Sequence, residues 1–157
     1  SDTHNNKSNI KAIIKILNKQ MVDLVIHTGD ICNQSSLEMF SKLNANLIGV
    51  FGNNDRSEKG LNETSKDLNF RFQNPPLDFE LKGRKISVFH EPDQIDQHLK
   101  ANPDIDLIVH GHTHRYRKEK VKNTYIFNPG ESAGFLKNKN ALGSVDLKNM
   151  EIKRIFF

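Results

Sequence analysis

Short apolar runs that suit β-strands alternate with helical stretches along the first third of the chain, and this alternation limits the possible folds most strongly. Residues 22–26 and 46–51 form the apolar runs, and residues 36–43 between them suit a helix. Before them, apolar side chains keep the i, i+3, i+4, i+7 spacing of one helix face, at Ile10, Ile13, Ile14 and Leu17. Because strands separated by helices usually pair in parallel, the sequence predicts an α/β layered fold.

The rest of the chain predicts a second sheet beside the first. Residues 58–72 are polar and suit a loop with a short helix, whereas the runs at 77–81 and 86–89 suit a β-hairpin. A helix is expected at 94–100 and a strand at 105–109. The tail suits antiparallel strands, expected at residues 124–127, 141–147 and 151–157, and we expect these tail strands to form the second sheet. A length of 157 residues is enough for one complete hydrophobic core, so we expect a single domain over residues 1–157.

Composition excludes several classes of protein. No apolar stretch approaches the roughly 20 residues that span a bilayer, and no signal peptide is visible. The single cysteine, Cys32, excludes an internal disulfide and fits a reducing compartment, so we expect a soluble cytoplasmic protein. The net charge of +4 suits a phosphate-bearing substrate but is too small to mark a nucleic-acid-binding protein.

Metal-binding residue types follow several of the apolar runs, at the point where each predicted strand ends. Ligands of open α/β sheets bind outside the carboxyl ends of the strands, so we expect these side chains to meet at one edge. A pair at positions i and i+2 near the start of the chain could share a face in the same way. The candidate ligands are Asp2, His4, Asp30, Asn53, His90, His112 and His114.

Four imidazoles, two carboxylates and one amide oxygen exceed the ligand number of one tetrahedral or octahedral ion. They suit two divalent transition-metal ions that share a carboxylate, with Mn foremost and Ni, Fe, Co and Zn as alternatives. The competing interpretation is a polar surface without a metal. Chance explains any one of these placements but not all of them, so we favour the metal site.

The same blocks resemble the calcineurin-like metallophosphoesterases, in particular their small bacterial and archaeal phosphodiesterase branch. The resemblance rests on Asp2-x-His4, Gly29-Asp30, Gly52-Asn53-x-Asp55, His90 and Gly111-His112-x-His114, in the family's order, and covers nearly the whole chain. It implies a two-sheet β-sandwich flanked by helices.

The resemblance also implies a ligand set for each ion. One ion would take Asp2, His4, Asp30 and His114, and the other would take Asp30, Asn53, His90 and His112, with Asp30 bridging. Such ions lie about 3.5–4 Å apart and can hold a bridging hydroxide that attacks phosphorus in line. The implied activity is that of a phosphodiesterase on a small phosphate ester. Composition leads us to expect no membrane partner and to disfavour a nucleic-acid partner, and a homo-oligomer stays open.

The chain departs from the family pattern at three places. Asn54 stands where many relatives carry a histidine proposed as acid or phosphate contact; an amide cannot supply a proton, but it can contact a phosphoryl oxygen. Glu91 follows His90 in place of a common glycine, and we expect it to face solvent. No strand stands ahead of Asp2, so we expect the native protein to have a short β-strand before Ser1.

Further residues near the blocks receive expectations of their own. Arg56 and Arg115 flank ligand blocks and are candidates to hold phosphate. We expect His27 to be packed, His98 to be solvated and His110 to support a ligand. Cys32 is expected to be buried rather than reactive.

Two other function classes remain open at this stage. One is a non-catalytic interaction module on the same fold, as in the retromer sorting subunit that this branch resembles; that subunit has lost some ligand residues, whereas this chain keeps all seven. The other is a nuclease or nucleic-acid-binding domain, for which two Tyr and no Trp give little support.

Overall fold

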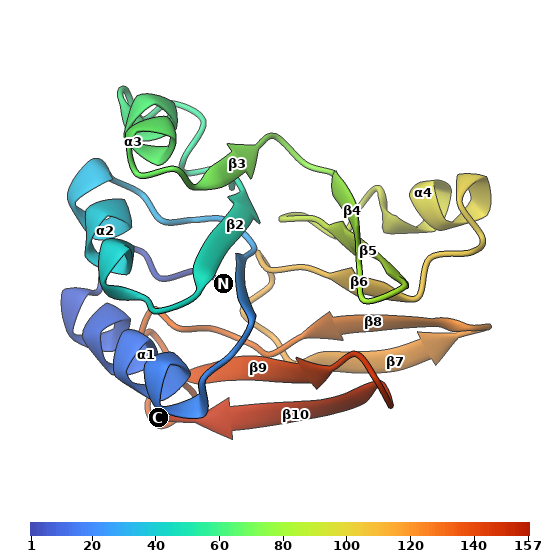
Figure 1. The fold of residues 1–157 in the computed structure, drawn as a ribbon. Helices are drawn as coiled ribbons and strands as arrows, with labels where there is room; N and C mark the ends of the chain where they lie inside the picture. Colours follow the sequence, from blue (N-terminus) through green and yellow to red (C-terminus); the bar gives the residue numbers. More distant parts are fainter.

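Three hydrogen-bonded sheets and four α-helices make up the fold, and the computed structural model describes all of residues 1–157 (Figure 1). The helices are α1 (Lys7–Gln20), α2 (Gln34–Met39), α3 (Leu61–Asp67) and α4 (Ile95–Ala101), with a short 3-10 helix, η1 (Phe40–Lys42), after α2. The strands are β1 (Leu24–His27), β2 (Asn46–Val50), β3 (Arg71–Gln73), β4 (Leu77–Leu81), β5 (Arg84–Val88), β6 (Leu107–Val109), β7 (Arg117–Val121), β8 (Thr124–Asn128), β9 (Ala141–Asp146) and β10 (Glu151–Phe156).

The first sheet has the order β1-β2-β3, and both pairings are parallel, as the alternation of strands and helices predicts. Helix α1 begins at the cap residue Asn6, whose side chain accepts a hydrogen bond from the Asn9 backbone N–H. Its four predicted apolar residues are all buried against the sheet. Strand β3 escaped prediction because it has only three residues and just its central Phe72 is partly buried.

The second sheet has the order β4-β5-β6-β8-β7. The predicted hairpin is present as β4 and β5, joined by Lys82 and Gly83, which both have positive φ as in a type I′ turn. Strand β7 was missed because its sequence is charged and mostly exposed, as suits an edge strand. The tail strands β9 and β10 pair only with each other, so the expectation that the tail forms the second sheet is wrong.

The sheets pack as two layers between helices, which confirms the predicted sandwich. Val50 of β2, Val88 of β5 and Ile152 of β10 belong to one buried cluster between the layers. Helices α1 and α2 cover the outer face of the first layer, and α4 packs on the five-stranded sheet through Ile95. The predicted helices at 36–43 and 94–100 correspond to α2 with η1 and to α4.

A cavity of about 540 Å³ lies beside β1 and β9. Residues 24–28 line one side and residues 142–148 the other, with Ile13 and Leu17 of α1 among the further lining residues. Each of these two strands ends its sheet, so each has one edge without a strand partner. No helix in the structure combines the length and the apolar character needed to cross a membrane.

Candidate metal centre

Loops that follow strands of both sheets bring the predicted ligands together. Asp30 follows β1 and Asn53 follows β2, whereas His90 follows β5 and the pair His112 and His114 follows β6. The start of the chain reaches the same place, because the Asp2 backbone N–H donates to the Gly29 carbonyl and that of His4 to the Asp30 carbonyl. All seven side chains predicted as ligands therefore lie at one edge of the sandwich.

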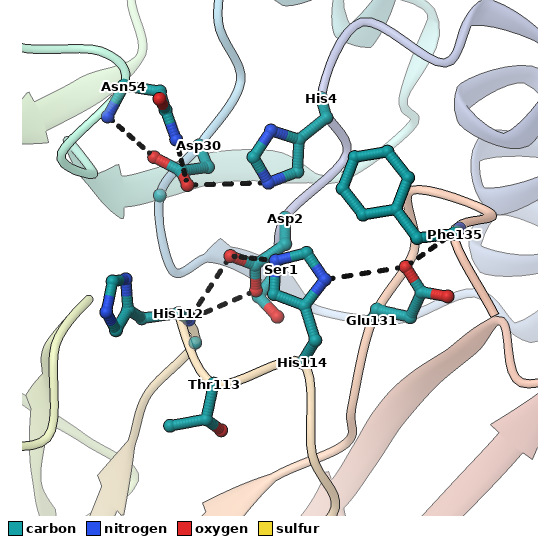
Figure 2. Close-up of polar contacts among 12 residues, drawn as sticks. Ser1, Asp2, His4, Asp30, Asn54, His112, Thr113, His114, Glu131 and Phe135 are labelled. Atoms are coloured by element: carbon teal, nitrogen blue, oxygen red, sulfur yellow. Dashed lines mark hydrogen bonds and ion pairs between the residues drawn. The ribbon is translucent and has the colours of Figure 1, made fainter.

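Asp30 lies between two histidines, of which Figure 2 shows His4. Its Oδ2 atom is 3.4 Å from Nε2 of His4 and 3.4 Å from Nε2 of His90. Asn54 donates its backbone N–H to Oδ1 of Asp30 at 3.0 Å and its side-chain amide to Oδ2 at 2.8 Å. Burial acts to raise the pKa of Asp30, but the bonds from His90 and Asn54 outweigh it and hold that pKa well below its usual range. Asp30 is therefore an anion at neutral pH.

A second group of ligand atoms surrounds Asp2. Its Oδ1 atom lies 3.6 Å from Nε2 of His114, and both carboxylate oxygens accept the His112 backbone N–H at 3.2 Å. The ligand atoms of Asp2, His4 and His114 lie within 4.8 Å of one another, and so do those of Asp2, Asp30 and His90. Asp2 thus belongs to both groups.

The hydrogen-bond pattern around His90 fits a bound cation. Nδ1 of His90 lies 2.7 Å from the Thr28 carbonyl oxygen, which can only accept, so this nitrogen carries the proton. Nε2 of His90 faces two acceptors, Oδ1 of Asn53 at 2.9 Å and the carboxylate of Asp30, so the ring donates from Nε2 as an imidazolium. Burial acts to lower the pKa of His90, but the hydrogen bonds to Asp30 and Thr28 outweigh it and raise that pKa. A bound cation would replace the proton on Nε2. Oδ1 of Asn53 also lies 3.0 Å from Nδ1 of His112.

The surroundings of His4 also fit a bound cation. Its Nε2 atom is buried and has no hydrogen-bond partner, although it points toward Asp30, and its Nδ1 atom lies 3.4 Å from Sγ of Cys32. A buried nitrogen without a partner is costly unless something else occupies its lone pair. The donor set of imidazole nitrogens with oxygens suits a transition-metal ion better than Ca²⁺ or Mg²⁺.

Backbone strain is concentrated at these positions. Five of the seven candidate ligands have a positive φ, a conformation that is uncommon for residues other than glycine. Each such residue costs on the order of 1–3 kcal/mol, and residues of this kind cluster at functional sites. The five are Asp2 (53°), His4 (40°), Asp30 (59°), His112 (65°) and His114 (55°).

Asp55 is a site residue for which sequence reasoning assigned no role. Its buried carboxylate accepts four backbone N–H groups at 2.7–2.9 Å, from Asp30, Ile31, Cys32 and Gly52. It thereby joins the loop after β1 to the loop after β2. The only signal in the sequence was its place in the Gly52-Asn53-x-Asp55 block. Gly52 is needed there because a Cβ atom would lie 2.2 Å from Oδ1 of Asp30.

Glu131 is a second site residue that was not predicted from the sequence. Its carboxylate is buried, and Oε2 lies 3.5 Å from Nδ1 of His114 (Figure 2). It also accepts the backbone N–H groups of Phe135 and Leu136. A carboxylate beside the second ring nitrogen of a ligand histidine fixes the orientation of the ring. An isolated glutamate after a turn gives no such signal in a sequence.

The residues that flank the ligand blocks differ from expectation. Glu91 does not simply face solvent, because both of its carboxylate oxygens bind Nη2 of Arg56, at 2.8 and 2.9 Å. Arg56, expected as a phosphate contact, is therefore already paired. Arg115 is exposed next to His114.

The remaining histidines are packed. His27 is buried, with Nε2 3.2 Å from Oγ1 of Thr3, as expected. His98 was expected to be solvated, but its Nε2 lies 3.3 Å from both Asp78 and Ser87, so that expectation is wrong. His110 is buried, with Nδ1 3.0 Å from the Gly111 carbonyl.

Cys32 is partly buried rather than fully buried. Its burial, together with the nearby carboxylates of Asp55 and Asp30, raises the pKa of the thiol to about 12. The thiol is therefore protonated at neutral pH, as expected for an unreactive cysteine.

Comparison with known proteins gives matches over nearly the whole chain. The family described as "Calcineurin-like phosphoesterase superfamily domain" matches residues 1–150. Phosphodiesterase MJ0936 of Methanocaldococcus jannaschii is 34% identical over 159 residues, which cover 99% of this chain and 95% of that protein.

Solved structures agree with this match. An archaeal phosphodiesterase superposes with a TM-score of 0.90 at 31% identity, covering 99% of this chain and 96% of its own. The phosphoesterase YfcE of E. coli gives a TM-score of 0.67 at 17% identity, with coverages of 98% and 94%. Vps29 of Entamoeba histolytica in complex with zinc gives 0.62 at 17% identity, with coverages of 94% and 88%. The last two show likeness of fold alone.

Proposed function

Because the chain belongs to the calcineurin-like phosphoesterase superfamily, we propose that it is a metal-dependent phosphodiesterase that hydrolyses a small phosphate ester. The observation that carries the proposal is Asp30, an anion whose Oδ2 lies 3.4 Å from each of two histidines. The relative named a phosphodiesterase, 34% identical over 99% of this chain, supports the choice of diester over monoester.

Two ions would be held by the two ligand sets that the family resemblance implies. One set is Asp2, His4, Asp30 and His114, and the other is Asp30, Asn53, His90 and His112. Mn is our first choice of metal, with Ni, Fe, Co and Zn as alternatives, because the set mixes imidazole and oxygen. When bound, such ions supply Lewis-acid charge at the phosphoryl oxygens and a water-derived nucleophile at neutral pH.

The protein's own side chains orient and balance charge around that centre. The carboxylate of Asp30 offsets the repulsion between two cations, and its low pKa keeps it anionic down to acidic pH. Asn54 holds Asp30 through two hydrogen bonds and, being exposed at the rim, is placed to contact a phosphoryl oxygen. Arg115, exposed beside His114, is our candidate for steering the anionic substrate.

The test combines metal analysis with a substrate screen. Protein reconstituted with Mn, Ni, Fe, Co or Zn is assayed for bound metal per chain and for hydrolysis of phosphomonoesters, phosphodiesters and oligonucleotides. We expect two ions per chain and the fastest turnover on a small diester. One ion or none would contradict the dinuclear centre, and preference for oligonucleotides would favour the nuclease alternative.

Three variants separate ligands from neighbours. Asp30→Asn removes the charge shared by both ions, so kcat/KM should fall by about 10³-fold or more. His110→Ala should lose roughly 10- to 100-fold if His110 supports the turn at Gly111. His98→Ala, at a packed histidine that contacts Asp78 and Ser87 and no candidate ligand, should leave kcat/KM unchanged. Wild-type metal content without activity on any ester would favour the interaction-module alternative.

A further inference from the structure

Phe135 is an exposed aromatic residue at the candidate centre. Its ring lies nearly parallel to the imidazole of His114, with an interplanar angle of 6° and centroids 5.5 Å apart. It also lies 5.2 Å from the ring of His4 (Figure 2). Phe135 nevertheless remains 65% exposed. Part of its apolar surface therefore opens to solvent directly beside two candidate ligands of one ion.

Hydrogen bonds, and not burial of the phenyl ring, hold the loop that carries Phe135 in place. Glu131 accepts the backbone N–H of Phe135 at 3.1 Å and that of Leu136. At its base, Asn6 donates to the Ala133 carbonyl at 2.7 Å and Asn9 to the Ser132 carbonyl at 2.8 Å. The exposure of the ring is thus a property of a fixed loop, and Leu136 next to it is also exposed. Single exposed apolar side chains are common on protein surfaces, so it is the position of Phe135 against two candidate ligands that makes it a candidate for substrate contact.

We propose that Phe135 binds the esterified group of the substrate, and that this group is planar and apolar, as in a phenyl or other aromatic phosphodiester. The inference rests on the phosphodiesterase function proposed above. A phosphate bound to the ion that His4 and His114 would hold would bring its ester group close to Phe135, whose ring lies 5.2 and 5.5 Å from the two imidazoles. Aromatic rings stack or meet edge to face at centroid distances of 4.5–7 Å. The open surface of Phe135 gives that group an apolar partner.

Binding of two non-hydrolysable phosphonates tests this without turnover. Metal-reconstituted protein is titrated calorimetrically with phenylphosphonate and with methylphosphonate, and the ratio of the two dissociation constants is the readout. Wild type should bind the phenyl compound more tightly. Phe135→Ala should reduce that preference by roughly 2- to 12-fold, the usual strength of an aromatic pair. Phe135→Trp should keep or increase it.

The matched control is Phe156→Ala, another exposed phenylalanine, which lies on β10. It should leave the ratio unchanged. The ratio cancels any common effect of the Phe135 variants on metal affinity. An unchanged ratio in Phe135→Ala, in a protein that still hydrolyses diesters, would overturn this inference alone. Failure to bind either phosphonate or to cleave any diester would overturn the proposed function as well.

Discussion

The backbone N–H of Asp30 donates a 2.8 Å hydrogen bond to Oδ2 of Asp55, so the carboxylate at the middle of the candidate centre is positioned by a second, buried carboxylate. The two residues belong to loops after different strands, β1 and β2. The geometry of the centre therefore depends on a residue that is not itself a candidate ligand.

Replacing Asp55 by Asn should damage both the fold and the centre. An amide offers one acceptor oxygen where the carboxylate offers two, and its NH₂ group would face N–H donors. We expect the free energy of unfolding to fall by about 2–4 kcal/mol, since buried donors lose their partners. Urea unfolding and elemental analysis measure the two effects. The exposed Asp93→Asn serves as control, and equal stability of both variants would contradict the role of Asp55.

The presence of Asn54 predicts that the rate of hydrolysis depends strongly on the leaving group of the substrate. The amide of Asn54 donates hydrogen bonds but cannot transfer a proton as an acid at neutral pH, and general acid catalysis is typically worth about 10²–10⁴-fold. The rate of the chemical step should therefore fall steeply as the leaving-group pKa rises. A series of substituted phenyl diesters measures this while keeping any stacking on Phe135 constant.

Asn54→His should flatten that dependence if its ring reaches the leaving oxygen, whereas Asn54→Gln should not. Both variants disturb the hydrogen bond from the side chain of residue 54 to Asp30, so the slope, and not the absolute rate, is the quantity to compare. A flat dependence in the wild type would mean that another group already donates the proton.

Buried His27 predicts a loss of stability in mild acid. Burial, and then the nearby His90, lower the pKa of His27 well below its ordinary value of 6.5. The unfolded chain takes up a proton near pH 6.5 while the folded protein does not. The contribution of His27 to the free energy of unfolding is therefore complete above pH 6.5. It is lost as the pH falls below 6.5, by up to about 1.4 kcal/mol per pH unit.

Nδ1 of His27 accepts the Gly29 N–H, so protonation would also break that bond. Urea unfolding of metal-free protein at pH 7.5, 6.5 and 5.5 gives the slope of stability against pH. His27→Gln removes this titration, and its slope should be smaller by up to one proton. Identical slopes in the two proteins would refute the prediction.

Helices and strands with a repeating apolar pattern could be predicted from the sequence, whereas a charged edge strand and single contacts between distant residues could not. Helix α1 and strands β1, β2 and β6 follow from their apolar spacing, and strand ends placed the ligand-type residues correctly. Strand β7 is charged, so its pairing with β8 comes from the sheet and not from its own pattern. Glu131 contacts His114 from 17 positions away in the chain. Such a contact has no local signature, because only tertiary structure creates it.

The cavity beside β1 and β9 lies next to two strand edges that have no strand partner. The Asp2 N–H bonds Gly29 and the His4 N–H bonds Asp30, so the start of the chain already runs alongside and parallel to the end of β1. An added segment of about five apolar residues could pair with both free strand edges and fill the cavity.

We predict that such an extension raises the free energy of unfolding by on the order of 2 kcal/mol, through new hydrogen bonds and apolar burial. Thermal unfolding of the extended and unextended chains measures the change. A segment of equal length made of serine and aspartate is the control. If both extensions shift the melting temperature equally, the cavity does not accept a strand.

The left-handed backbone at five candidate ligands lowers the stability of the metal-free chain, although the side chains at these positions are the ones that the proposed function needs. In the metal-free chain, glycine would adopt the φ values of 40° to 65° found there more readily than aspartate or histidine does. Laboratory selection for heat resistance alone would therefore tend to replace these residues and erase the centre. Their persistence under such selection would itself indicate that a bound ion, rather than the polypeptide, compensates for the strain.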